Sequence, residues 1–174
     1  MSLKPLVSIV LGTRPEAIKL APVIEVFKAS QNLNTRIIFT GQHKEMVEQV
    51  MRLFDFKSNN NLNLMRPNQS LTHITCEVLK GLQEEFRQFN PNLVLVQGDT
   101  TTAFAASLSA FYSNIPVGHI EAGLRTDVLN DPFPEEGNRR LISQIASLHF
   151  APTANSRKNL IKSGAKGIIK ITGN

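Results

Sequence analysis

The sequence predicts an α/β fold built on one doubly wound, Rossmann-like parallel sheet. Short apolar runs alternate with helical patterns along the whole chain, which is typical of consecutive βαβ units. Several of these runs are continuously apolar, as expected for parallel strands that helices cover on both faces. The runs predicted to be strands are residues 6–11, 36–40, 93–96, 116–120, 148–151 and 168–171.

The segments between these runs show helical periodicity. Pro22 falls inside the first segment, where we expect it to kink or interrupt the helix. The third segment follows Ser70, a suitable N-cap, and repeats apolar residues at intervals of three and four. Gly164 is placed to end the last helix. The predicted helices are residues 16–29, 43–54, 71–89, 101–112, 135–147 and 156–163.

Size and composition fit a single globular domain spanning residues 1–174. With 41% hydrophobic and 19% charged residues, the chain can bury a sizeable core. The single cysteine, Cys76, excludes an internal disulfide, and no apolar run approaches the ~20 residues of a membrane helix. The N-terminus also lacks the apolar core of a signal peptide. We therefore expect a cytoplasmic protein without membrane contact.

The net charge of +5 is concentrated near the C-terminus, since residues 137–174 contain no Asp or Glu. Nucleic-acid binding is disfavoured, because this stretch has no Trp and offers only Phe150 for base stacking. A solvated face would account for the excess, as would a surface that meets an acidic partner from another domain or subunit. The basic residues are Arg139, Arg140, Arg157, Lys158, Lys162, Lys166 and Lys170.

Four glycine-containing turns with polar side chains follow predicted strands. Ligands bind beyond the carboxyl ends of the strands in doubly wound sheets, so we expect the four turns to meet at one edge. This convergence, more than any single turn, predicts a functional site. The turns are residues 12–16, 40–43, 98–102 and 119–123.

The first turn is suited to an anion. Gly12 allows a sharp turn into a helix whose N-terminal amides favour negative charge. Arg14 can clamp a phosphate and Lys19 can add a second positive charge, unless both are merely solvated helix residues. The G-x-G-x-x-G fingerprint and the Walker A motif are both missing, so we expect no nicotinamide and no other cofactor.

Two carboxylates occupy the later turns. Asp99 either belongs to the site or, with the threonines after it, only caps the next helix. Glu121 needs partners, because a carboxylate at the end of a buried strand is costly without them. His119 would point the same way as Glu121 if the strand continued. Since no third ligand follows at a recognisable spacing, we expect no metal.

A loop of about a dozen residues follows Glu121 and leads to Pro134, Glu135 and Glu136. Loops of that length in compact domains are usually functional or disordered. Proline and acids at a helix start are also ordinary capping residues. The polar turns elsewhere in the chain favour a role for this loop in the site.

At these motifs the chain resembles the non-hydrolysing UDP-N-acetylglucosamine 2-epimerases, bacterial enzymes that make UDP-N-acetylmannosamine. The resemblance implies two Rossmann-like domains in a GT-B arrangement, with substrate in the cleft between them. This sequence resembles the N-terminal half, and the resemblance leads us to expect that the family's C-terminal nucleotide-binding domain is absent after Asn174. The matching segments are residues 12–19, 42–46, 98–102, 119–126, 132–136, 138–139 and 172–174.

The resemblance also implies roles for individual residues. Asp99, Glu121 and Glu135 match the family's catalytic carboxylates. Its substrate contacts from this half are matched by Arg14, Lys19, Asp99 and Glu121.

Further implications concern regulation and assembly. Gln42 and His43 are the candidates for contact with a second, activating UDP-sugar. The family's homodimers are the expected assembly, and the missing C-terminal domain is the expected partner in the cleft. Without that domain, we expect the isolated chain to be inactive.

Carboxylates suit this reaction. The C2 hydrogen of a hexosamine is not acidic, since no carbonyl adjoins it, so inversion needs either an oxidation or departure of UDP from C1. Without a dinucleotide fingerprint, elimination and re-addition of UDP is the expected route, in which carboxylates stabilise the ring charge and move the C2 proton. The open alternatives are a hydrolysing 2-epimerase, a GT-B enzyme acting on another UDP-sugar, and a non-catalytic domain that binds nucleotide sugars.

Overall fold

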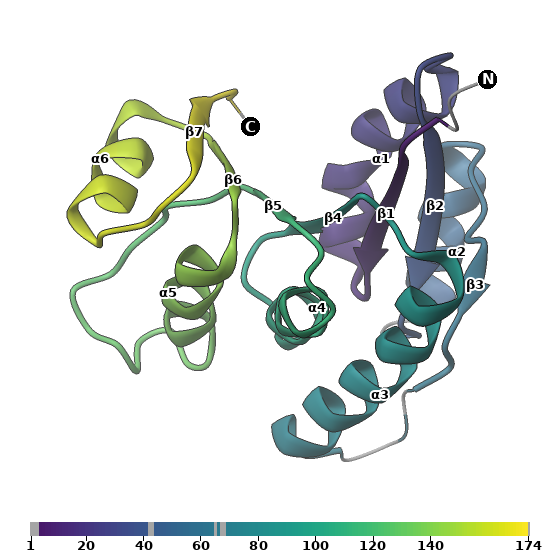
Figure 1. Ribbon diagram of the computed structural model, residues 1–174. Coiled ribbons are helices and arrows are strands. Elements are labelled where there is room, and N and C mark those ends of the chain that lie inside the picture. The colour runs from purple at the N-terminus through teal and green to yellow at the C-terminus, as the bar shows by residue number, and fades with distance from the viewer. Residues whose placement is uncertain (1–3, 42–43, 65, 67–68, 174) are drawn as a thin grey trace.

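The computed structural model describes residues 4–41, 44–64, 66 and 69–173. In this part of the chain, seven strands form one parallel sheet in the order β3-β2-β1-β4-β5-β6-β7 (Figure 1). The strand order reverses after β3, so the neighbouring strands β1 and β4 flank the topological switch point. The strands are β1 (Leu6–Leu11), β2 (Asn34–Phe39), β3 (Asn60–Asn61), β4 (Leu93–Gln97), β5 (Val117–Ile120), β6 (Leu148–Ala151) and β7 (Ile168–Ile171).

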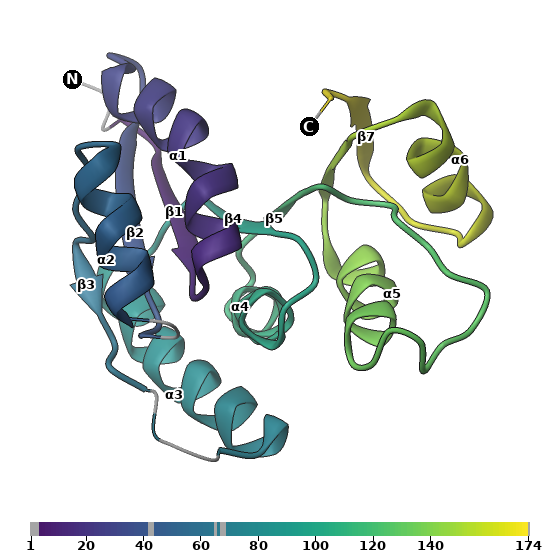
Figure 2. The ribbon, with the colours of Figure 1, turned by 180° about the vertical axis from the view of Figure 1, so that it is seen from behind.

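Helices cover both faces of the sheet. Figure 1 and Figure 2 show α1 and α2 on one side and α3, α4 and α5 on the other. Alternate residues of β1 face the two layers: Ile9 and Leu11 join the core under α1, and Val10 joins the core under α4. The helices are α1 (Arg14–Ala29), α2 (Lys44–Leu53), α3 (Leu71–Phe89), α4 (Thr101–Tyr112), α5 (Glu135–Ile145) and α6 (Ala154–Lys162).

The predicted fold class is confirmed, and so are the six predicted strands. β2 begins at Asn34, two residues earlier than predicted. The two-residue strand β3, which pairs with the end of β2, was not predicted. It consists of two asparagines inside a polar loop and therefore has no apolar run that would reveal it.

Of the two expectations for Pro22, a kink or an interruption of the first helix, the interruption is wrong, because α1 is one helix from Arg14 to Ala29. A proline inside a helix removes one backbone hydrogen bond and costs ~3 kcal/mol. Pro22 is exposed, whereas Leu20, Ala21 and Ile24 on either side of it are buried against the sheet. Packing of this apolar face maintains the helix across the proline.

A buried ion pair joins the edge of the sheet to α3. The carboxylate of Glu85 accepts hydrogen bonds from Arg36 of β2 and, at 2.7 Å, from Asn60 of β3. The side chain of Glu85 is only 3% exposed, and the Arg36 guanidinium also stacks over the ring of Phe89. This contact anchors a strand pair that is otherwise very short.

Removing the Glu85 carboxylate is expected to destabilise the protein strongly. Glu85→Ala leaves the Arg36 charge without its partner, and we expect the free energy of unfolding in urea to fall by about 3 kcal/mol. Glu84→Ala is the matched control, because Glu84 pairs with Arg87 in full exposure and should leave the unfolding midpoint unchanged. Equal midpoints for the two variants would contradict a stabilising role for the buried pair.

Candidate active site

Glu16 connects the turn after β1 to the turn after β4. Its buried carboxylate accepts hydrogen bonds from the amides of Gly12 and Thr13 at 2.9 and 2.6 Å, and from the Thr13 hydroxyl at 2.8 Å. The other oxygen accepts a 2.7 Å bond from the hydroxyl of Thr100, the N-cap of α4. Burial raises the pKa of Glu16, and these four donors oppose the rise. The protein's own carboxylate therefore occupies the amides that were expected to attract an anion.

Asp99 is held by the first turns of α5. Two nitrogens of the Arg139 guanidinium lie 2.8 and 2.6 Å from Asp99 Oδ2. The amide of Asn138 donates a 2.8 Å bond to the backbone carbonyl of Asp99. Both contacts come from α5, so the position of Asp99 depends on this helix and not only on the turn that carries it.

Glu121 directly follows β5 and has a φ of +65°, in the left-handed region that non-glycine residues rarely adopt. The Lys19 amine of α1 lies 2.7 Å from each of its carboxylate oxygens. Gln97, the last residue of β4, donates a further hydrogen bond to Oε2. The side chain of Glu121 is only 10% exposed. Its partners come from two other elements, and backbone strain of this kind is typical of functional sites.

Asp99 and Glu121 lie at adjacent strand ends. A Cβ built on Gly98 would be 3.8 Å from Glu121 Oε2, which places this carboxylate beside the residue before Asp99. β4 and β5 are paired directly, with Gln97 opposite Ile120. The structure thus brings Asp99, Glu121 and Lys19 together at the carboxyl edge of the sheet, next to the switch point.

The two acids at the start of α5 differ in their surroundings. Glu136 is fully buried and accepts bonds from the Thr126 amide at 3.1 Å, from Arg139 at 3.2 Å and from Arg140 at 2.8 Å. Burial raises its pKa, but these hydrogen bonds bring the net pKa below the usual value. Glu136 therefore fixes the loop after β5 onto α5.

Glu135, in contrast, is half-buried, and its side chain forms no hydrogen bond or ion pair with the residues that the structure describes. It precedes Arg139 by one helical turn, so the two side chains share a side of α5. Arg139, one turn further along α5, binds Asp99, so Glu135 begins the helix that contacts the Asp99 turn.

His119 has a structural position beneath this edge. Its buried Nε2 lies 2.6 Å from the carbonyl of Gly98. Burial lowers the pKa of His119 to about 4, so the ring is neutral at pH 7. Because a carbonyl can only accept, Nε2 carries the proton. β5 ends at Ile120, so the condition under which His119 and Glu121 would point the same way is not met.

For the remaining residues predicted to belong to the site, the described part of the chain shows no hydrogen bond or ion pair with Asp99 or Glu121. Arg14 is the exposed first residue of α1. Gln42 and His43 lie outside the described residues. Among the 165 residues that are described, no three His, Cys, Asp or Glu side chains are grouped to hold a metal ion, and no helix has the length and apolarity to cross a membrane.

Sequence reasoning included Glu16 and Glu136 in the candidate turns and loop but gave their carboxylates no role of their own, and it did not single out the amide of Gln97. A signal existed for Glu16, because Thr13 and Glu16 have the spacing of a capping box. Gln97 reads only as the end of an apolar strand. No sequence feature shows that Glu136 and its neighbour Glu135 have different roles.

Comparison with known proteins identifies close relatives. A family model described as UDP-N-acetylglucosamine 2-epimerase matches residues 25–174. The enzyme of that name from Neisseria meningitidis is 52% identical over 166 residues, which are 95% of this chain and 45% of the relative. The one from Escherichia coli K12 is 50% identical over 166 residues, 95% of this chain and 44% of the relative. The chain thus spans less than half the length of these relatives.

Solved structures show the same likeness. The crystal structure of UDP-GlcNAc 2-epimerase from Neisseria meningitidis bound to UDP-GlcNAc has a TM-score of 0.93 and 50% identity, over 97% of this chain and 47% of that one. A lipopolysaccharide outer core galactosyltransferase has a TM-score of 0.71 at 13% identity, over 98% of this chain and 45% of that one, so it shares the fold alone.

Acidification is expected to destabilise the protein through His119. Its pKa is about 4 in the folded state and near 6.5 when unfolded, so the unfolded state binds more protons between these values. The free energy of unfolding should therefore fall by about 3 kcal/mol from this residue as the pH drops from 7 to 4, measured by urea denaturation.

His119→Gln is the control for this pH dependence, because its amide retains a donor for the Gly98 carbonyl without titrating. The variant should be less stable than the unmodified protein at pH 7. Between pH 7 and pH 4, however, its free energy of unfolding should fall by about 3 kcal/mol less than that of the unmodified protein. His149, whose pKa burial also lowers, acts in the same direction but is present in both proteins. Parallel stability curves for the two proteins would show that His119 does not titrate as expected.

Proposed function

Because the chain belongs to the UDP-N-acetylglucosamine 2-epimerase family, we propose that it forms one half of an epimerase active site. The reaction is the interconversion of UDP-N-acetylglucosamine and UDP-N-acetylmannosamine. The observation that carries this proposal is the strained, nearly buried Glu121 beside the Asp99 turn, at the edge where doubly wound sheets bind ligands. The homologue crystallised with UDP-GlcNAc supports the choice of substrate.

The proposed route is elimination and re-addition of UDP. As UDP leaves C1, positive charge develops on the sugar ring, and carboxylates stabilise that charge and remove the C2 proton. Reprotonation on the opposite face then inverts C2, so acid and base groups are needed on both sides of the ring. We assign these duties to Asp99, Glu121 and Glu135 together. They lie in the turn after β4, directly after β5 and at the start of α5.

Lys19 and Arg14 are the proposed contacts for the diphosphate. Glu16 already accepts the amide hydrogens of Gly12 and Thr13, so the phosphates must rely on side chains rather than on those amides. The Lys19 amine bridges both oxygens of Glu121 and can share its charge with a phosphate bound beside them. Exposed Arg14 is free to swing toward the same anion.

A second Rossmann-like domain is the proposed other wall of the cleft. The chain matches 44–45% of its relatives' length, and in the GT-B arrangement the remaining half faces this edge. We therefore expect the isolated 174-residue chain to turn over no substrate. Assembly as a homodimer and contact of Gln42 and His43 with an activating UDP-sugar are parts of the same proposal.

A chimaera that joins residues 1–174 to the remaining part of the Neisseria meningitidis relative tests this function. With UDP-N-acetylglucosamine in deuterated water, we expect UDP-N-acetylmannosamine with deuterium at C2, detected by proton NMR. Asp99→Asn, Glu121→Gln and Glu135→Gln should each lower kcat by about 10²- to 10⁴-fold, since each removes a group that moves a proton or stabilises charge.

Glu84→Gln is the control variant. Glu84 is an exposed acid of α3, a helix that carries none of the assigned site residues, and among the described residues it pairs only with Arg87. The variant should keep full activity. Release of free N-acetylmannosamine and UDP would identify a hydrolysing enzyme instead. A folded chimaera that neither forms product nor exchanges deuterium would overturn the proposal.

A further inference from the structure

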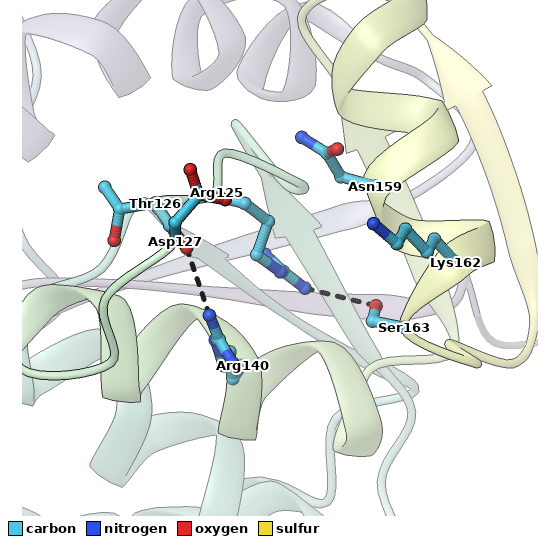
Figure 3. A pocket seen from close by; sticks show the side chains of 7 residues that line it. All are labelled: Arg125, Thr126, Asp127, Arg140, Asn159, Lys162 and Ser163. Carbon is cyan, nitrogen blue, oxygen red and sulfur yellow. Dashed lines mark hydrogen bonds between the residues drawn. The ribbon is translucent and has the colours of Figure 1, made fainter.

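A polar cavity of about 310 Å³ lies between α5, α6 and the loop that follows β5 (Figure 3). None of the residues assigned above to the active site lines it. Its lining includes three cations and only one carboxylate, that of the exposed Asp127. The cations are Arg125, Arg140 and Lys162.

The Arg125 guanidinium is half-buried in this cavity without an acidic partner. It donates to the Leu124 carbonyl at 2.8 Å and to the hydroxyls of Ser143 and Ser163 at 2.9 and 3.4 Å, and all three acceptors are neutral. No acidic side chain in the described part of the chain forms an ion pair with it. Arginine has five N–H donors, so two of them are left for a ligand.

The electrostatic surroundings of Arg125 favour an added anion. Burial lowers its pKa; Glu136 opposes this, and the neighbouring cations Arg140 and Arg139 lower it further. A half-buried charge is costly unless it is compensated. An anion between Arg125 and its neighbours would supply that compensation.

Two residues of α6 complete the ring of donors. Figure 3 shows the Lys162 amine and the Asn159 amide directed toward the same space as the Arg125 side chain. The Asn159 amide donates a 3.0 Å bond to the Gly123 carbonyl, which fixes α6 against the loop. Lys162 is exposed and forms no ion pair with any described residue.

We propose that this cavity binds a phosphate group, as the free ion or as the phosphoryl end of a small molecule. Each of the two remaining N–H groups of Arg125 can donate a hydrogen bond to a phosphate oxygen, and Lys162 adds a point charge. The cavity also gives a reason for part of the positive excess in residues 137–174, since Arg140 and Lys162 belong to that stretch.

Titration of the 174-residue chain with inorganic phosphate, followed by amide proton–nitrogen NMR, tests the site. We expect saturable, single-site shifts at residues 125–127 and 159–163. A parallel titration with glycerol 3-phosphate distinguishes the two sources: tighter binding of the monoester indicates a phosphorylated molecule, and tighter binding of phosphate indicates the free ion. Neither measurement involves turnover, so the result is independent of the proposed catalytic activity.

Variants locate the binding. Arg125→Gln and Lys162→Gln should each weaken phosphate binding at least about tenfold, the usual size of a lost charged hydrogen bond. Lys158→Gln removes the same charge from α6 but does not line the cavity, and it should bind like the parent. If Arg125→Gln does not fold, phosphate binding by Lys162→Gln tests the site, because Lys162 is exposed and its replacement should not affect folding.

Three outcomes would overturn the proposal. Shifts confined to residues 12–19 would place the anion at the active site. Shifts that do not saturate in the millimolar range would indicate diffuse attraction by the positive surface. Equal weakening by Lys158→Gln and Lys162→Gln would show that total charge, and not the cavity, governs binding.

Discussion

The ion pair between Lys19 and Glu121 is the contact on which the arrangement of the carboxyl edge depends. Lys19 belongs to α1, Glu121 directly follows β5, and Gln97 of β4 binds the same carboxylate, so this acid connects α1, β4 and the end of β5 across the switch point. Left-handed backbone at a non-glycine residue costs on the order of 1–3 kcal/mol and persists only where the surroundings determine it. The hydrogen bonds from Lys19 and Gln97 hold Glu121 in this conformation, and the other residues of the carboxyl edge are arranged around it.

Most of this edge could be predicted from the sequence, because topology places it. Once the apolar runs are assigned as parallel strands, the residues after them must lie at one edge, and Asp99 and Glu121 follow at adjacent ends. Strand topology alone does not predict which side chains form hydrogen bonds with one another. Gln97 ends an apolar strand like any other residue, and only the geometry of β5 makes it a partner of Glu121.

The neighbours Glu135 and Glu136 show where sequence reasoning stops. Both begin α5, and both fit ordinary capping chemistry. A step of one residue turns a side chain by 100° around a helix, so the two acids point in different directions, and only Glu136 meets the amide of Thr126. Which acid faces which partner depends on the path of an irregular loop, and no hydrophobic period encodes that path. The continuity of α1 through Pro22 has the same origin, since packing outweighs local preference there.

Glu16 changes how the first turn binds an anion. A glycine turn leading into a helix normally offers its amides to a ligand. Here two of those amides point at a carboxylate that also holds Thr100, so the turn contributes rigidity and the anion is left to side chains.

The basic residues near the C-terminus differ in their acidic partners. Arg139 is committed to Asp99 and Glu136, and Arg140 shares the buried Glu136 with it. Glu136 therefore joins the acidic edge of the sheet to the wall of the cavity through two adjacent arginines. A ligand that drew Arg140 away from Glu136 would leave that buried carboxylate more dependent on Arg139, which is also the support of Asp99. Since a buried acid is costly without its partners, the two regions are connected energetically through this one side chain.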